Sequence, residues 1–131
     1  MVKWMKNKTI LFVHQNFPAQ FKSLAPKLAN DKTYEIHTLA SKKDNSIKNP
    51  PDYISSMKNI SHHHYVIDKG SSSKIHLFAQ EFETKMIRAE AVANKCFELK
   101  EKGLTPDLVI DHPGWGETFF IKEIWPDCKL L

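Results

Sequence analysis

TILFVHQNFPAQ, residues 9–20, begins as a short, continuous apolar run and continues into a polar loop. Residues 9–14 are rich in residues that favour β-structure, and an uninterrupted apolar run of this length is typical of a strand buried on both faces of a parallel sheet. The stretch PDLVIDHPGWGE, residues 106–117, has a similar form, with a predicted strand over 107–112 around an apolar centre, followed by a loop with two glycines. Together they predict an α/β fold built on a parallel sheet.

A helix is expected directly after the first strand. Pro18 suits the first turn of a helix, and Asn30 and Asp31 end the pattern. Pro26 lies inside this segment and argues against an unbroken helix. Four apolar residues follow Pro18 at helical spacing: Phe21, Leu24, Ala25 and Leu28.

Three further segments have the pattern of strands. Residues 34–39 are expected to form the second strand, 64–67 the third and 128–131 the fifth, with 107–112 as the fourth. Residues 41–61 contain two adjacent prolines among Asn and Ser, which predicts an irregular connection.

The longest periodic pattern predicts an amphipathic helix over residues 74–102, with Gly103 as its stop. Its apolar face comprises Phe78, Phe82, Met86, Ala89, Ala93, Cys96 and Phe97. Because Cys96 belongs to this face, we expect it to be a small buried hydrophobe and not a nucleophile. A short helix is expected over residues 116–124.

Strands that alternate with helices imply right-handed βαβ units on an open parallel sheet, so the chain is predicted to be a Rossmann-like three-layer domain. The usual strand order for such a sheet is 3-2-1-4-5. The 131 residues suffice for one domain, residues 1–131. Since the pattern stops inside its last strand, we expect this chain to be the N-terminal piece of a longer protein.

Composition and charge narrow the class of protein. The chain is 41% hydrophobic, with no apolar run near the ~18 to 20 residues of a membrane span and no secretory leader, which predicts a cytoplasmic protein. Its two cysteines have no metal-site or disulfide spacing. The net charge of +4 is concentrated in residues 1–50, where nine Lys/Arg face three Asp/Glu. We interpret this basic segment mainly as a lysine-rich surface exposed to solvent, and peripheral contact with an anionic membrane stays an alternative. No basic stretch carries the interleaved aromatic residues of a single-strand nucleic-acid binder, so nucleic acid is not an expected partner.

Two polar loops are predicted to meet across one crevice. In open α/β sheets, ligands bind beyond the carboxyl ends of the strands where the strand order reverses, which lies between the first and fourth strands. The loops HQNFPAQ (residues 14–20) and HPGWGE (residues 112–117) follow those two strands. This is the strongest physical argument for the position of the functional site.

The first of these loops has no glycine, which excludes the dinucleotide-binding fingerprint and argues against a tightly bound NAD or FAD. Gln15, Asn16 and Gln20 offer neutral hydrogen-bond donors and acceptors that suit hydroxyl-rich ligands such as sugars. Alternatively, Gln15 or Asn16 caps the following helix.

The second loop contains residues that suit close approach to a ligand. Gly114 and Gly116 permit backbone conformations or contacts that a side chain would block. The N–H groups near Gly116 and Glu117 would open a helix and receive an anion, and Glu117 would bond a hydroxyl or favour the helix N-terminus through the dipole. Trp115 would stack on a sugar ring or pack as a lid.

Histidines mark the two strand ends. His112 and His14 are candidates to hydrogen-bond a substrate or to stabilise developing charge, although each alone is more often structural. The run His62-His63-His64 suggests a metal site, but neighbours in an extended chain point alternately to opposite sides, so at most two could share one ion. No metal is expected there.

The segments ILFVHQNFPAQFKSLAPKLA (residues 10–29) and PDLVIDHPGWGETFFIKEIWPDCKLL (residues 106–131) resemble the N-terminal region of family 4 glycosyltransferases that open with His-Gln-Asn-Phe-Pro. Glu81-Phe82-Glu83 and residues 89–93 in the long helix fit the same pattern. The resemblance covers most of the chain, except residues 41–74.

The resemblance implies a two-domain GT-B enzyme that transfers a sugar, with retention of configuration, from a nucleotide-sugar to a glycan or lipid-linked acceptor. It implies no required metal and no tightly bound cofactor. The N-terminal domain would hold the acceptor, and the C-terminal nucleotide-sugar-binding domain is absent from this chain, so the fragment alone is expected to be inactive. His112 stands where many relatives place a histidine near the transferred sugar and is the candidate catalytic residue. The candidate substrate contacts are His14, Gln15, Asn16, Phe17, Gln20, Pro113, Gly114, Trp115, Gly116 and Glu117.

Two alternatives from other classes remain. The chain could be a stand-alone Rossmann-like module that binds a sugar or nucleotide without catalysis, or a dinucleotide-dependent sugar-modifying enzyme. The glycine-free first loop argues against the second alternative.

Overall fold

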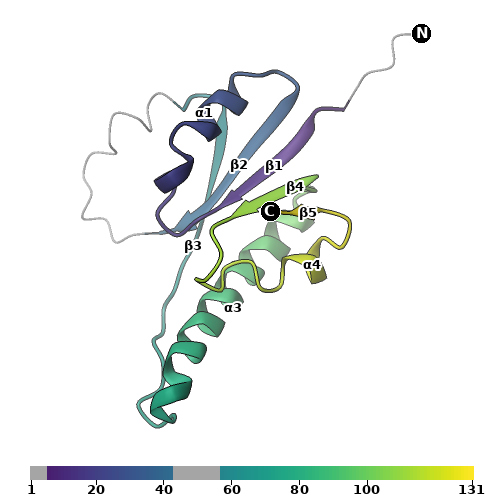
Figure 1. Cartoon of the computed structure of the whole chain (residues 1–131). Helices are drawn as coiled ribbons and strands as arrows, with labels where there is room; N and C mark the ends of the chain where they lie inside the picture. The colour runs from purple at the N-terminus through teal and green to yellow at the C-terminus, as the bar shows by residue number, and fades with distance from the viewer. Residues whose placement is uncertain (1–5, 43–56) are drawn as a thin grey trace.

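The computed structural model describes residues 6–42 and 57–131, which form a five-stranded parallel sheet in the order β3-β2-β1-β4-β5 (Figure 1). The predicted fold class and strand order are therefore confirmed. The strands are β1 (Lys8–Val13), β2 (Tyr34–Ser41), β3 (Ile60–Tyr65), β4 (Leu108–Asp111) and β5 (Lys129–Leu130).

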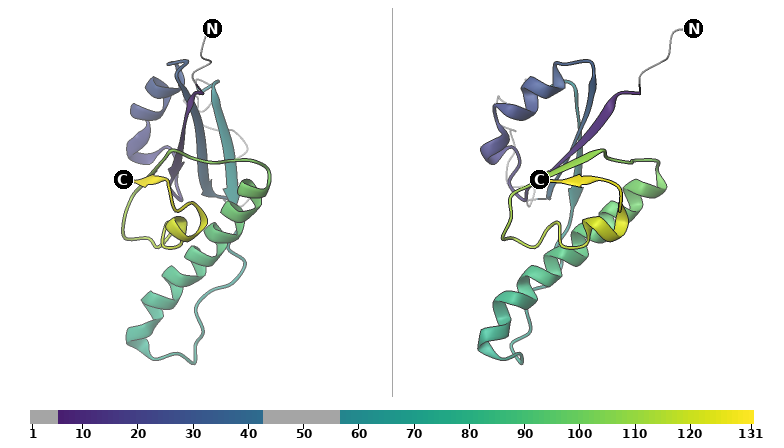
Figure 2. Two further views of the ribbon diagram at one scale, coloured as in Figure 1. Left: turned by 90° about the vertical axis from the view of Figure 1, so that its right-hand side faces the viewer. Right: turned by 45° about the vertical axis from the view of Figure 1, so that its right-hand side comes forward.

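The central strand β1 is buried on both faces, as its continuous apolar run predicts. Every residue of β1 after Lys8 is buried, because alternate side chains face two separate cores. Leu11 and Val13 pack with residues of α3 (Gln80–Glu101) and α4 (Ile121–Ile124), whereas Ile10 and Phe12 pack with α1 (Leu24–Ala29). The sheet is thus the middle of three layers (Figure 2).

The helix expected after the first strand is split in two. A short 3-10 helix, η1 (Ala19–Phe21), precedes α1 (Leu24–Ala29). Pro26 is the third residue of α1, within the first turn, where a missing backbone N–H costs no intrahelical bond. The proline therefore fixes where the regular helix begins and does not break it.

The long helix is shorter than predicted, and its predicted apolar face is buried only at Ala89, Ala93 and Cys96. It runs from Gln80 to Glu101 after a 3-10 turn, η2 (Leu77–Ala79), and Gly103 ends it with a φ of +99°. Its buried residues are Ala89, Val92, Ala93, Cys96 and Leu99. Phe78, Phe82 and Phe97 of the predicted apolar face are exposed. Phe78 and Phe82 belong to η2 and the N-terminal half of α3, which project beyond the sheet (Figures 1 and 2).

Several other boundaries differ from the prediction. The third strand is Ile60–Tyr65 and not residues 64–67, and β2 continues to Ser41, so the expected irregular connection 41–61 is shorter at both ends; its residues 43–56 lie outside the described residues. The helix expected over 116–124 is the single turn Ile121–Ile124, and the last strand is only Lys129–Leu130.

Cys96 is fully buried in the core between the sheet and α3, and burial raises the pKa of its thiol to about 12. Its predicted role as a small hydrophobe is confirmed. Within residues 6–42 and 57–131, none of the helices combines the length and the apolar character that crossing a bilayer requires.

Candidate functional site

The two polar loops meet where the topology predicts. Since β1 and β4 are neighbours, with Val13 paired to Asp111, the residues that follow them lie side by side. The rings of His14 and His112 are 5.7 Å apart between centroids. His14 is buried and His112 is exposed, so only His112 of this pair offers its ring freely to solvent.

His14 is held in one orientation by its own loop. Its Nδ1 accepts a hydrogen bond from the Asn16 backbone N–H at 2.9 Å. Burial, and then the charge on His112, lower the pKa of His14 below 6.5, which favours the neutral ring. With Nδ1 acting as the acceptor, the neutral ring carries its proton on Nε2, which can only donate.

The remaining candidates of the first loop divide by exposure. Asn16 and Gln20 are exposed, whereas Phe17 is half-buried with its ring 6.1 Å from that of Phe12. Neither η1 nor α1 has a side-chain cap, so the capping alternative for Gln15 and Asn16 is wrong. The Gln15 carbonyl accepts the Ser41 N–H at 3.2 Å and ties the loop to β2.

The second loop needs both of its glycines. Gly114 and Gly116 have φ of +106° and +86°, in the region that favours glycine. A Cβ on Gly116 would lie 2.7 Å from the carbonyl oxygen of Lys85 in α3, whereas one on Gly114 would meet nothing within 4 Å. Gly116 thus lets the loop dock against the helix.

No helix begins at this loop, contrary to the expectation for Gly116 and Glu117. The nearest one, α4, begins at Ile121 and has four residues. The predicted anion-binding helix N-terminus at Gly116 is therefore wrong. Pro113, Gly114 and Trp115 are exposed, and they present their surfaces beside His112.

Glu117 is turned into the protein. It is 2% exposed, and its Oε1 accepts a hydrogen bond from the hydroxyl of Tyr65, at the end of β3, at 2.7 Å. Burial raises the pKa of Glu117, although the Tyr65 bond acts in the opposite direction. The side chain joins the second loop to β3 and does not favour a helix dipole.

Around Glu117 lies a buried polar cluster that the sequence analysis missed. It contains Tyr65, Arg88, Asp111 and Thr118 besides Glu117, and the Thr118 hydroxyl donates to Asp111 Oδ2. Burial is also the main cause that raises the pKa of Asp111. Arg88 Nε, Asp111 Oδ1 and Glu117 Oε2 are buried and find no partner within the described part of the chain.

One signal in the sequence points to this cluster. Asp111 is the last residue of the apolar strand β4, and a carboxylate that is partly buried there requires polar partners. The identity of those partners is not readable, because they come from segments far apart in the sequence.

Arg88 links α3 to the second loop. Its Nη1 donates to the Trp115 carbonyl oxygen at 3.0 Å, and its guanidinium carbon lies 5.6 Å from the centroid of the indole. One face of Trp115 is thereby supported by a cation–π contact, while the side chain stays 42% exposed. An aromatic ring held in this way can stack on an apolar face of a ligand.

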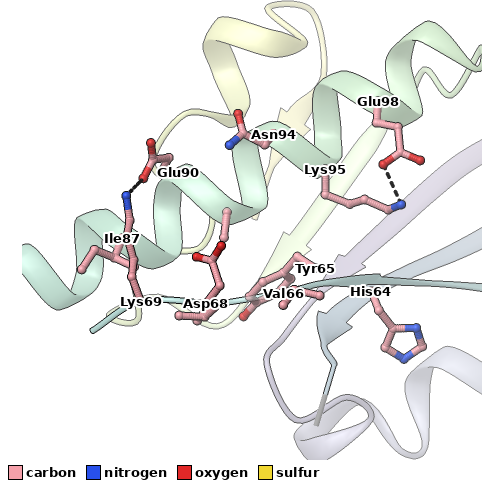
Figure 3. Close-up of a pocket in the computed structure, with 12 residues that line it drawn as sticks. His64, Tyr65, Val66, Asp68, Lys69, Ile87, Glu90, Asn94, Lys95 and Glu98 are labelled. Carbon is pink, nitrogen blue, oxygen red and sulfur yellow. Dashed lines mark hydrogen bonds and ion pairs between the residues drawn. The ribbon is translucent and has the colours of Figure 1, made fainter. Parts of the chain in front are cut away.

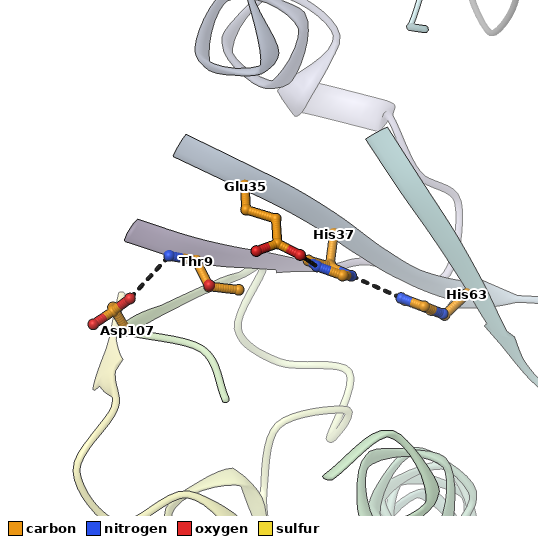
Figure 4. A network of polar contacts seen from close by, with 5 residues as sticks. All are labelled: Thr9, Glu35, His37, His63 and Asp107. Carbon is orange, nitrogen blue, oxygen red and sulfur yellow. Dashed lines mark hydrogen bonds and ion pairs between the residues drawn. The ribbon is translucent and has the colours of Figure 1, made fainter. Parts of the chain in front are cut away.

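The three adjacent histidines point to opposite sides of β3, as expected for a strand. His62 Nδ1 lies 2.8 Å from the hydroxyl of Thr38 on one side, and His63 Nε2 lies 2.9 Å from His37 Nδ1 on the other. The second nitrogen of His37 is 2.9 Å from a carboxylate oxygen of Glu35 (Figure 4). Within residues 6–42 and 57–131, no group of three or more His, Cys, Asp or Glu side chains could hold a metal ion.

Comparison with known families gives one result. The sequence profile that describes the glycosyl transferase family 4 group matches residues 32–131. The matched region includes β2 to β5, the loop 112–117 and the buried cluster, whereas the loop 14–20 lies before it. No curated protein sequence matches the chain.

Proposed function

This chain belongs to the glycosyl transferase family 4 group, and on that premise we propose that it is the acceptor-side domain of a retaining GT-B enzyme that moves a hexosyl group from a nucleotide-sugar to an acceptor hydroxyl. The observation that carries the proposal is the meeting of the two polar loops beyond the carboxyl ends of β1 and β4, where the rings of His14 and His112 lie 5.7 Å apart between centroids. We take this meeting point as the predicted crevice. The family match includes the second loop, residues 112–117, but not the first loop, residues 14–20. The resemblance of the first loop to the family is therefore supported by the sequence of that loop alone.

The chemistry of the crevice supports transfer by positioning. Among the residues described there, hydrogen-bonding groups and an aromatic surface dominate: exposed His112 and Asn16, buried His14 and half-exposed Trp115. Holding two reactants in a reactive geometry contributes a large part of catalysis in such a site. In this proposal His112 contacts the transferred sugar, Trp115 stacks on a sugar ring, and residues 14–20 line the acceptor side.

The donor belongs to the other side of the crevice. We assign the nucleotide-sugar to a second, C-terminal domain. The proposed reaction requires no metal and no tightly bound cofactor. We place the protein in the cytoplasm and leave peripheral contact with a membrane open. The composition of residues 14–20 supports this division, because they include no Lys, Arg or Gly and so lack the cationic side chains and the glycine-rich turn that commonly bind a pyrophosphate.

The direct test is a transfer assay on the complete gene product. The protein is incubated with a panel of nucleotide-hexoses and acceptors, and product is followed by NMR of the anomeric proton. A product whose anomeric configuration equals that of the donor supports the proposal. An inverted product would refute retention, and binding of sugars without turnover of any donor would favour a non-catalytic binding module.

A further inference from the structure

A polar groove lies beside the candidate site, where β3 ends. It has a volume of about 510 Å³ and lies between residues 64–69 and one face of α3 (Figure 3). That volume is within the range of pockets that bind small organic ligands. The groove is formed entirely by described residues, and none of the candidate residues of the two loops lines it.

The groove is connected to the site through Tyr65. This residue lines the groove, and its hydroxyl donates to Glu117 of the loop that carries His112. A ligand in the groove would therefore lie against the same residue that holds the second loop in place. This contact joins the groove to the loop that carries His112.

The lining suits hydroxyl-rich ligands. Ile87 and Ala91 contribute apolar surface from α3, and Asn94 contributes an amide from the same helix. Asp68, on the opposite wall, has a carboxylate with no ion-pair partner among the residues that the structure describes; in Figure 3 it points toward α3. Carboxylates and amides bond sugar hydroxyls, while aliphatic side chains contact the C–H faces of the rings.

The charges of the groove disfavour anions. Its lining holds three carboxylates (Asp68, Glu90 and Glu98) and two ammonium groups (Lys69 and Lys95). Both ammonium groups are already paired, Lys69 with Glu90 and Lys95 with Glu98, each at 2.8 Å. A phosphate would therefore meet net negative charge, whereas a neutral or amino-bearing ligand would not.

One ion pair crosses the groove and is easily displaced. Lys69 reaches from the 64–69 wall to Glu90 on α3, and both side chains are more than half exposed. An exposed pair of this kind adds little to stability, because solvent screens the two charges. Entry of a ligand that replaces its contacts thus costs little.

From these observations we propose that the groove between residues 64–69 and α3 is a subsite for a neutral or amino-bearing glycan acceptor. The proposal rests on the proposed function, which it narrows by excluding acceptors whose bound part is a phosphate or diphosphate. The bound glycan would extend from the groove past Tyr65 toward His112.

An NMR titration of the ¹⁵N-labelled chain tests this assignment. The probes are cellotriose as a neutral ligand, a chitosan trimer as an amino-bearing ligand and glucose 1,6-bisphosphate as an anion. Asp68→Asn and Asn94→Leu alter the groove, Trp115→Ala alters the loop, and Glu101→Gln, exposed at the far end of α3, is the matched control.

The proposal expects both trisaccharides to shift amide resonances of residues 64–69 and 87–98, and the bisphosphate to leave them unchanged. Asp68→Asn should weaken binding of the chitosan trimer several-fold, and Glu101→Gln should not affect it. Shifts confined to residues 14–20 and 112–117 would overturn the assignment of the groove as a subsite and would leave the proposed function intact. Shifts by neither trisaccharide in either region would overturn the subsite, while the proposed function stands or falls separately by the transfer assay. Equal shifts by the bisphosphate would overturn the assigned ligand class.

Discussion

Replacing Gly116 with alanine should destabilise the domain more than the same change at Gly114. Both glycines lie in the loop 112–117 and both have a positive φ, +86° and +106°. They differ in their surroundings, because the new Cβ at Gly116 would lie 2.7 Å from Lys85 O and 3.0 Å from Lys85 Cβ, whereas the Cβ at Gly114 would be free. The pair therefore separates backbone strain from a steric clash.

The magnitudes follow from these two contributions. A left-handed conformation costs a non-glycine residue roughly 1–2 kcal/mol, and this applies to both variants. The clash at Gly116 involves backbone of α3, which cannot rotate away, and forced overpacking costs about 1–3 kcal/mol more. We expect a loss of about 1 kcal/mol for Gly114→Ala and about 3 kcal/mol for Gly116→Ala.

Urea denaturation followed by circular dichroism measures both losses. The difference of about 2 kcal/mol should appear as a lower midpoint with an unchanged slope, and as a Tm lower by roughly 8 °C. Equal losses for the two variants would refute the close approach of the loop to α3. A change of slope for Gly116→Ala would show that more than local packing was altered.

Three further predictions follow from polar contacts. Burial and the charges on His37 and Lys95 lower the pKa of His63 from 6.5 to about 4, so the unfolded chain binds more protons than the folded one as the pH falls from 7 to 4. Stability should fall over this range by no more than about 2 kcal/mol, because solvent screens part of the effect at this half-buried ring; a His63→Gln variant with the same pH dependence of unfolding would contradict this cause. Tyr65→Phe leaves a buried carboxylate without its donor and should cost about 1–3 kcal/mol in urea denaturation; a loss below about 0.5 kcal/mol would argue against the bond. Arg88→Lys should weaken the cation–π contact and broaden the indole N–H resonance of Trp115, with a loss of about 1 kcal/mol; an unchanged resonance would exclude Arg88 as its support.

The sheet was predictable because its central strands are buried. The continuous apolar run of β1 predicts a strand that is buried on both faces of the sheet. The alternation of strands and helices then restricts the sheet to a few parallel topologies. β3 was misplaced for the opposite reason. It is an edge strand with the sequence ISHHHY, and its exposed histidines give no apolar pattern.

The long helix shows a second limit of periodicity. An apolar face predicts a helix equally well whether or not another layer covers it. Phe78 and Phe82 fit the pattern and are exposed, because they lie on the part of the chain that projects beyond the sheet. Only the positions that face β-strands, such as Val92 and Cys96, are buried.

The sequence predicted which two loops form the candidate site, but it did not predict which side chains contact one another there. Topology alone brings His14 and His112 together, since parallel neighbours end at the same edge. The bond between Tyr65 and Glu117 joins residues 52 positions apart, and the contact of Arg88 with Trp115 spans 27. Such pairs depend on how the helix packs against the sheet, which local sequence does not encode.

The central claim is that this crevice positions a sugar for transfer, and His112→Ala in the complete gene product tests it most directly. Because His112 is exposed, the substitution should change the free energy of unfolding by no more than about 0.5 kcal/mol. Sugar transfer, measured as nucleoside diphosphate released per enzyme, should fall by at least about tenfold. Turnover equal to that of the unaltered protein would contradict the account and remove His112 from the reaction.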